Sequence, residues 1–171
     1  MELVYVDGND LRAAELAAIA PSLHFTIAAL QSGFSTSAPE PGQRARDKVL
    51  AHPIAGDCFA EAVDLTTIDG KSLRLELDSE NENRFCKWWR ETPVTMQLAI
   101  AMRRGGEVQL FSAACTGCIA NKPAGPLILG WDRLFVPSAD AGDETLAQLI
   151  AAGELVEFRR EAFAQLVRAL A

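Results

Sequence analysis

The chain has 171 residues, of which 49% are hydrophobic and 23% are charged, so its size and composition suit a globular protein with one sizeable core. Its formal net charge of −7 argues against a general partner for nucleic acids or anionic membranes, although a few local cations or a metal ion can override this charge at a nucleotide site. No apolar run approaches the ~18–20 residues of a membrane span and no signal sequence opens the chain, so we expect a single cytoplasmic domain over residues 1–171 with reduced cysteines.

The N-terminal residues predict a strand, a tight turn and a helix. Residues 3–6 are apolar and rich in β-forming side chains, and the polar residues 7–10 follow them. Residues 11–20 are patterned as a helix that Asn9 or Asp10 can cap. Because a strand, turn and helix in this order aim backbone N–H groups at a phosphate, the turn is a first candidate site.

The middle of the chain predicts a β-hairpin. Residues 59–65 and 71–77 are two strand-like runs, and the dipeptide Asp69-Gly70 lies between them. An Asp-Gly pair between alternating runs is a strong short-range hairpin signal. We therefore expect residues 71–77 to pair antiparallel with the strand that contains Leu65.

The remaining elements follow from apolar periodicity and from glycine and proline positions. Further strands are predicted at residues 23–30, 94–103, 107–113 and 115–120, and further helices at 43–51, 81–91 and 153–170. Neither repeats nor a linker interrupt this order of elements, which predicts one mixed α/β domain.

The most specific motifs lie in the C-terminal half. They are, in order, Val108-Gln-Leu-Phe111, Thr116-Gly-Cys-Ile119, Gly130-Trp-Asp132, Leu134-Phe-Val-Pro137 and Thr145-Leu-Ala147. Their order and spacing resemble the inosine/xanthosine triphosphate pyrophosphatases, a family that splits non-canonical purine nucleoside triphosphates into monophosphate and pyrophosphate. The resemblance implies a long, twisted mixed β-sheet flanked by helices, with two lobes and a nucleotide cleft. It also implies a homodimer.

Two further motifs extend the resemblance toward the N-terminus. Asp7-Gly8-Asn9, with Arg12 after it, is similar to the family's phosphate-binding turn, in which a lysine stands at the position of Arg12. The resemblance implies that Gly8, Asn9 and Arg12 contact substrate phosphates, a role compatible with Asn9 also capping the helix. Lys87 lies in a motif similar to another substrate-binding segment of the family.

The metal site implied by the resemblance is altered. Such a site uses carboxylates, because Mg²⁺ takes oxygen ligands and bridges phosphates. Glu61 matches a family acid, the family's catalytic Asp is replaced by Ala62, and Asp64 shares a strand face with Ala62. We expect Glu61 and Asp64 to be catalytic and Glu40, Glu61 and Asp64 to hold Mg²⁺, where the family's loop acid is either Glu40 or missing. The alternative for Glu61 and Asp64 is a solvated strand face.

The residues implied for base recognition are also altered. Leu129 stands where the family stacks an aromatic ring on the purine, whereas Trp131 and Asp132 are retained. Arg159 replaces a family histidine and Arg160 is retained. A family lysine that contacts phosphate is replaced by an acid, Glu154.

Two functional hypotheses follow from these retained and lost residues. The first is a divergent, Mg²⁺-dependent nucleoside-triphosphate pyrophosphatase. The alternative is a catalytically impaired family member that binds a nucleotide or a protein partner. The adjacent Trp88 and Trp89 are candidates for the interface of a homodimer, because aromatic side chains are enriched at interface cores.

Overall fold

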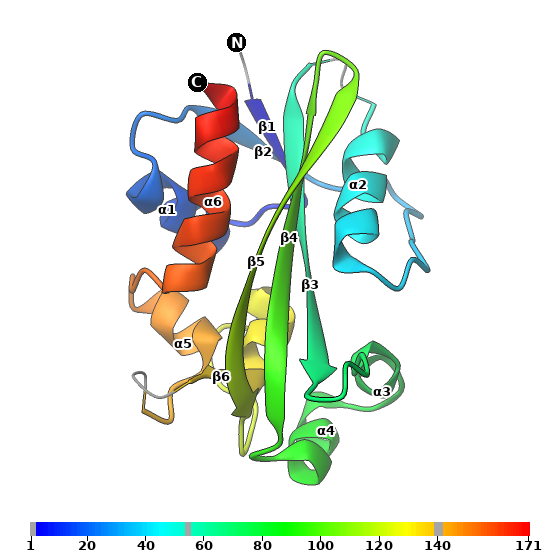
Figure 1. The fold of residues 1–171 in the computed structure, drawn as a ribbon, viewed down its shortest axis with the longest axis vertical. Coiled ribbons are helices and arrows are strands. Elements are labelled where there is room, and N and C mark those ends of the chain that lie inside the picture. Colours follow the sequence, from blue (N-terminus) through cyan, green and yellow to red (C-terminus); the bar gives the residue numbers. More distant parts are fainter. Residues whose placement is uncertain (1–2, 54–55, 139–141) are drawn as a thin grey trace. The chain divides into compact units, whose positions relative to one another are not determined.

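A single mixed sheet organises the computed structural model, which describes residues 3–53, 56–138 and 142–171 (Figure 1). In the described residues the strand order is β2-β1-β3-β4-β5-β6. Strand β1 (Leu3–Val6) pairs in parallel with β2 (Phe25–Ala28) and with β3 (Cys58–Thr67). Strand β5 (Glu107–Ile119) pairs antiparallel with β6 (Phe135–Pro137). Parallel and antiparallel pairs in one sheet confirm the predicted mixed α/β fold.

Strands β4 (Pro93–Arg104) and β5 are long and are joined by a tight turn. Gly105 and Gly106 form that turn with φ of 57° and 87°, a conformation that glycine adopts without steric cost. Residues 107–113 and 115–120 were predicted as separate strands, but they belong to one continuous strand that ends at Ile119. Ala114 is compatible with extended backbone, so nothing at this position ends the strand.

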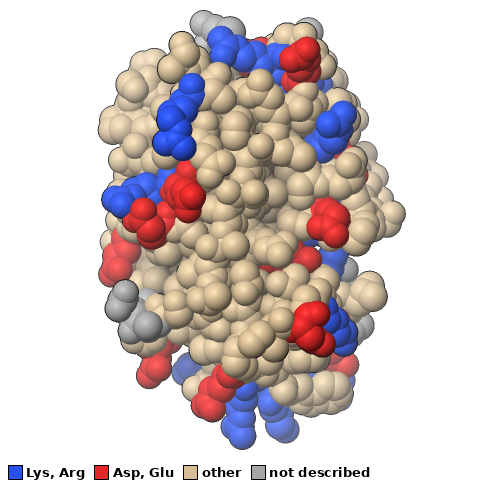
Figure 2. Space-filling view, in the orientation of Figure 1, with Lys and Arg blue, Asp and Glu red and all other residues tan. Residues whose placement is uncertain are grey.

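Helices flank the sheet as predicted. The described helices are α1 (Asp10–Ile19), α2 (Pro41–Ala51), α3 (Arg74–Ser79), α4 (Glu82–Trp89), α5 (Leu146–Ala151), α6 (Glu157–Leu170) and the 3₁₀ segment η1 (Leu127–Leu134). Within the described ranges, none of these helices has the length and hydropathy that crossing a bilayer requires. Acidic and basic side chains are interspersed on the face drawn in Figure 2, and neither sign forms a continuous patch there.

The chain divides into two compact units, in agreement with the two predicted lobes. Unit 1 comprises Met1–Ala62, Leu98–Ala113 and Glu157–Ala171, and unit 2 comprises Val63–Gln97 and Ala114–Val156. The assignment of residues 1–171 to one domain stays a prediction.

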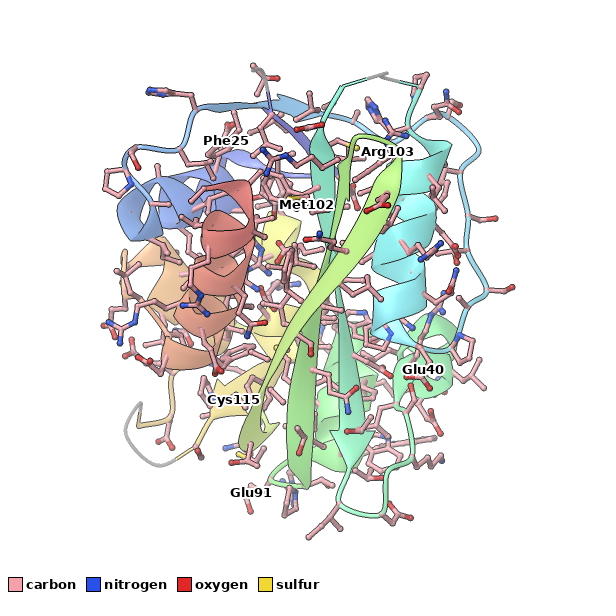
Figure 3. The ribbon with its side chains drawn as sticks, turned by 45° about the horizontal axis from the view of Figure 1, so that its top comes forward. Phe25, Glu40, Glu91, Met102, Arg103 and Cys115 are labelled. Carbon is pink, nitrogen blue, oxygen red and sulfur yellow. The ribbon has the colours of Figure 1, made fainter. Side chains whose placement is uncertain are left out.

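The core of unit 1 packs α2 against the parallel strands. Its buried members are small or branched apolar side chains: Val4, Val6, Ala45, Val49, Cys58, Ala60, Ala62 and Ala101. Arg103 fastens the end of α2, because its Nη1 donates to the carbonyl oxygens of Val49 at 2.8 Å and of His52 at 3.1 Å (Figure 3). These contacts hold α2 against the strands of unit 1.

The predicted strand at residues 71–77 is wrong. Gly70 does form a turn with φ of 83°, and Thr66 and Ser72 form an isolated antiparallel bridge, but the chain then enters α3. Leu73 and Leu77 are buried four residues apart, whereas Leu75 is 78% exposed. Burial of two residues four positions apart fits the period of a helix. Tertiary packing in unit 2 therefore outweighs the alternating leucines of the sequence, which favour a strand.

This correction can be tested with two leucine substitutions. Leu73→Ala should lower the free energy of unfolding by about 2–4 kcal/mol, because it opens a cavity at a fully buried position. Leu75→Ala should change it by less than about 0.5 kcal/mol, because that side chain is largely in water. Urea unfolding of both variants measures the difference, and equal losses would restore the strand, in which both leucines share one face.

Candidate functional site

The turn between β1 and α1 is the centre of the candidate site in unit 1. Asp7 ends the strand with φ of 62°, in the left-handed region, and its N–H donates to the carbonyl of Ala28 at 2.7 Å. Asn9 caps α1, since its side-chain oxygen accepts from the backbone N–H of Arg12 at 3.0 Å. The predicted capping role of Asn9 is therefore confirmed, and the start of α1 presents its N–H groups at this turn.

Gly8 is required by its neighbour rather than by its own backbone angle. A Cβ at this position would lie 2.6 Å from Cδ1 of Tyr5. The Tyr5 ring is completely buried and stacks on Phe59 with 4.5 Å between the ring centroids. A side chain at position 8 would have to displace this packed ring.

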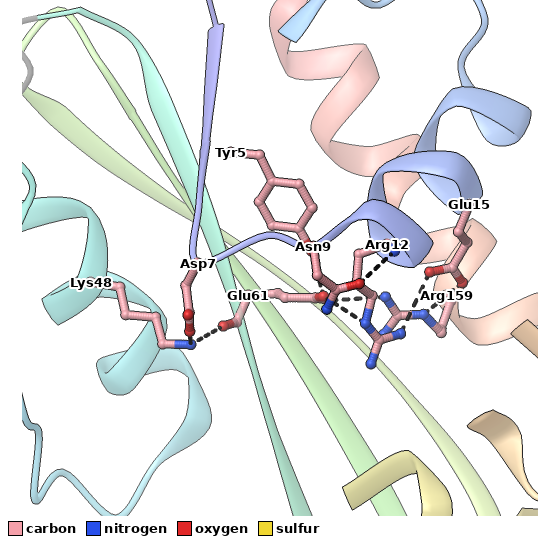
Figure 4. Close-up of polar contacts among 8 residues, drawn as sticks. All are labelled: Tyr5, Asp7, Asn9, Arg12, Glu15, Lys48, Glu61 and Arg159. Atoms are coloured by element: carbon pink, nitrogen blue, oxygen red, sulfur yellow. Dashed lines mark hydrogen bonds and ion pairs between the residues drawn. The ribbon is translucent and has the colours of Figure 1, made fainter. Parts of the chain in front are cut away.

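Four charged side chains beside the turn form a closed ring (Figure 4). Arg12 contacts Glu61 at 3.2 Å and Glu15 at 3.5 Å. Arg159 contacts Glu15 at 2.7 Å and Glu61 at 2.9 Å. We call these four residues the Arg–Glu ring. It joins α1, β3 and α6 within unit 1, and its two positive and two negative groups balance.

Tyr5 completes the surroundings of Glu61. The Tyr5 hydroxyl donates to Oε1 of Glu61 at 2.5 Å. Burial alone would oppose ionisation of Glu61, but the charges of Arg159 and Arg12 and the hydrogen bonds from Tyr5 and Arg159 outweigh it and lower the pKa of Glu61 to about 2. Burial and the adjacent carboxylate raise the pKa of Tyr5. Glu61 is therefore ionised across the physiological range and accepts hydrogen bonds on both oxygens.

Lys48 lies on the other side of Glu61. Its ammonium group contacts Oδ2 of Asp7 at 2.6 Å and donates to the backbone carbonyl of Glu61 at 2.9 Å (Figure 4). The lysine reaches this position from α2, which the core of unit 1 holds against β1 and β3. A cation thus stands at the carboxyl-terminal end of β1.

The other predicted metal ligands have separate surroundings. Asp64 is buried in unit 2, where its Oδ1 accepts from Ser72 at 2.9 Å and from the N–H of Leu65 at 3.0 Å. Glu40 precedes α2 and is exposed (Figure 3). Among the residues that the structure describes, no group of three His, Cys, Asp or Glu side chains is arranged to hold a metal ion.

The residues implied for substrate contacts differ in exposure. In unit 2, Leu129 and Asp132 are buried, Trp131 is half-buried and Lys87 is exposed. In unit 1, Arg160 is exposed and paired with Glu157. The substrate roles of these residues stay predictions.

Unit 2 also contains a pocket of about 760 Å³. It is lined by residues 116–122 and 136–138 together with Thr145 and Gln148, among others. Neither Trp131 nor Asp132 belongs to its lining. The pocket therefore does not support the predicted base contacts.

Sequence reasoning missed three residues of the site in unit 1. Tyr5 was counted as an apolar strand residue, and nothing local indicates that its hydroxyl reaches Glu61. Glu15 belongs to the quoted N-terminal motif without an assigned role, although its spacing from Arg12 allows contact on one helix face. Lys48 lies on a predicted helix, and only packing of that helix brings it to Asp7.

Comparisons with known proteins agree with this fold. A sequence model of the Ham1 family matches residues 74–169, more than half of the chain. A HAM1 protein from Coxiella burnetii has a TM-score of 0.69 at 16% identity, with 99% of this chain and 98% of that chain covered. The Ham1 protein of Staphylococcus aureus has a TM-score of 0.65 at 19% identity, with 99% and 98% covered.

A nucleoside-triphosphatase/dITP/XTP pyrophosphatase from Mycobacterium abscessus has a TM-score of 0.52 at 20% identity, with 99% of this chain and 96% of that chain covered. No curated protein matches the chain significantly. At these identities the solved structures show a common fold. The predicted family resemblance and α/β fold are confirmed.

The Arg–Glu ring predicts a specific acid sensitivity. Because the pKa of Glu61 is lowered from 4.5 to about 2 in the folded chain, its contribution to stability is complete above pH 4.5 and is lost as the pH falls toward 2. Between about pH 5 and pH 2, the free energy of unfolding of the wild type should fall by about 3 kcal/mol more than that of Glu61→Gln. Urea unfolding across this range measures it, with the exposed Glu107→Gln as control. Parallel curves for wild type and Glu61→Gln would contradict the ring.

Proposed function

Because the chain belongs to the Ham1 family, we propose that it is a nucleotide hydrolase of the pyrophosphatase type. In the proposed reaction, water attacks the α-phosphorus of a nucleoside triphosphate and pyrophosphate leaves, so that a nucleoside monophosphate remains. The observation that carries the proposal is the β1–α1 turn of unit 1, where Asn9 caps a helix directly after a strand. This arrangement is suited to phosphate, because helix N–H groups and the helix dipole favour an anion.

Mg²⁺ is the cofactor that the family resemblance implies, and the residues of unit 1 do not fit it. Both oxygens of Glu61 accept from arginine or tyrosine, and two guanidinium groups repel a further cation. Asp64 keeps a carboxylate of the type that Mg²⁺ prefers, although Ser72 and a backbone N–H already donate to one of its oxygens. We propose Asp64 as the catalytic carboxylate, and Mg²⁺ dependence of the reaction stays a prediction.

The alternative function has its own supporting observation. Glu61 is engaged in the Arg–Glu ring, and Ala62 offers no carboxylate in place of the family's catalytic Asp. A chain with these properties can still bind a nucleotide or a partner protein without hydrolysing anything. The two proposed functions therefore differ in whether the nucleotide is hydrolysed. In both of them, phosphate binds at the β1–α1 turn.

The proposed contacts with the base come from the sequence resemblance. They are assigned to Trp131 and Asp132. Activity on inosine triphosphate is proposed to be weak, because Leu129 offers no aromatic ring for stacking on the purine. A cytoplasmic location and a homodimer complete the proposal.

Substitutions on β3 separate the two functions. Asp64→Asn keeps the size of the side chain and removes its charge, so it should abolish Mg²⁺-dependent pyrophosphate release, a loss of at least about 100-fold. Ala62→Asp should raise the rate by restoring a carboxylate. Both variants and the wild type are measured against a panel of nucleoside triphosphates, with circular dichroism to confirm folding. Undiminished turnover in Asp64→Asn excludes the catalytic role, and no release from any form favours the binding protein.

The homodimer is tested at the tryptophans of α4. Trp88 is 66% exposed, and an exposed indole of this size is costly unless a partner covers it. The wild type should be a dimer by light scattering at concentrations on the order of tens of micromolar, and Trp88→Ser should shift it toward monomer. Leu155→Ser, at another exposed apolar position of unit 2, is the matched control. A wild-type monomer at these concentrations would contradict the prediction.

A further inference from the structure

The segment of unit 2 from Ala124 to Arg133 is closed at its base by Arg133. The backbone N–H of Ala124 donates to the carbonyl oxygen of Arg133 at 3.0 Å, and Nε of Arg133 donates to the carbonyl oxygen of Gly125 at 3.1 Å. We call residues 124–133 the 124–133 loop. It contains Trp131 and Asp132, the two residues to which contacts with the base are assigned.

Each end of the 124–133 loop is fixed to a different helix of unit 2. At the first end, Oγ1 of Thr145 donates to the carbonyl oxygen of Ala124 at 2.9 Å, and a Cβ on Gly125 would lie 2.7 Å from a side chain of α5. At the second end, Nη1 of Arg133 forms an ion pair with Glu82 in the first turn of α4. Arg133 therefore links the base of the loop to α4.

The guanidinium group of Arg133 is suited to this link, because it donates in several fixed directions. Its Nε donates to a carbonyl oxygen while its Nη1 pairs with a carboxylate, and the side chain is 12% exposed. Salt therefore screens the ion pair less than it would on an open surface, and charge-assisted hydrogen bonds are stronger than neutral ones. The end of the loop is thus held through both the backbone and the side chain of Arg133.

The backbone in the middle of the 124–133 loop departs from helical geometry. Gly130 has φ of 52° and ψ of −121°, so it interrupts the 3₁₀ segment η1. Glycine adopts such a backbone without steric cost, but it also loses more conformational freedom than other residues when it is fixed. The orientation of Trp131 and Asp132, which lie between Gly130 and Arg133, therefore depends on how the loop is held at Arg133.

We propose that Arg133 is a positioning residue for recognition of the base: by joining Gly125 to Glu82, it fixes the orientation of Trp131 and Asp132. The inference rests on the proposed function, since it names the residue that supports its proposed base contacts. Arg133 acts through the loop and not through attraction of phosphate. Its loss should therefore weaken binding of a nucleotide that carries a base and leave binding of a triphosphate without a base unchanged.

The test compares inosine and xanthosine triphosphate with inorganic tripolyphosphate, by calorimetry on the full chain in EDTA. Arg133→Gln should weaken binding of both nucleotides by at least about fivefold, because contacts with the base become misaligned, and should change binding of tripolyphosphate by less than about twofold. Glu82→Gln breaks the same link at a partly exposed side chain and should act in the same direction. The double variant should bind no more weakly than Arg133→Gln, because the two residues act as a unit.

The matched control is another arginine–glutamate pair at α4. Arg84 contacts Glu80 at 3.3 Å and its side chain is 59% exposed, so Arg84→Gln should leave all three affinities unchanged. Circular dichroism confirms that each variant is folded.

The other outcomes contradict the proposal in distinguishable ways. If Arg133→Gln binds both nucleotides as tightly as the wild type does, the role of Arg133 is overturned while the proposed function stands. Equal weakening for tripolyphosphate, or for Arg84→Gln, shows a general charge effect and also overturns that role. If the wild type binds the nucleotides no more tightly than tripolyphosphate, the base contacts are overturned together with the role of Arg133. If the wild type binds none of the three, nucleotide binding itself is overturned.

Discussion

The Arg–Glu ring is the interaction on which the rest of unit 1 depends. Its members come from α1, β3 and α6. Three of its four contacts join elements that are distant in sequence, and the fourth lies within α1. Arg159 is completely buried, and a buried charge persists only where partners compensate it. Because each arginine has two carboxylate partners, loss of one member leaves the other three with an unbalanced charge. The ring therefore sets where α6 begins relative to the β1–α1 turn.

The same ring determines which polar groups near the β1–α1 turn are already paired within the fold. Glu61 is kept ionised by Arg12, Arg159 and Tyr5, so it serves as a fixed acceptor within the fold. Three features of the turn lie outside the Arg–Glu ring. They are the start of α1, Asn9 as its cap, and the ion pair of Lys48 with Asp7. The proposed catalytic carboxylate, Asp64, lies outside both the ring and the turn, because Ser72 and the N–H of Leu65 hold it in unit 2.

The sequence was sufficient to predict those elements whose strand, turn and capping signals come from neighbouring residues. The strand at residues 3–6, the cap at Asn9 and the helix after it all follow from neighbouring residues, and the structure confirms them. Residues 71–77 show the opposite case. Their alternating leucines favour a strand, but unit 2 buries Leu73 and Leu77 and leaves Leu75 in water, so the segment becomes helical. The alternating pattern by itself does not indicate which of these leucines become buried.

By itself, the sequence determined the α/β class, the N-terminal strand, turn and helix, and the family, because these depend on short motifs and on their order along the chain. Only the tertiary structure decided what the charged residues do. Arg159 and Glu15 are 144 positions apart, and no spacing rule connects them. Lys48 reaches Asp7 only because α2 packs on β1 and β3. Charge pairing depends on distances that folding creates, and residue types alone do not contain those distances.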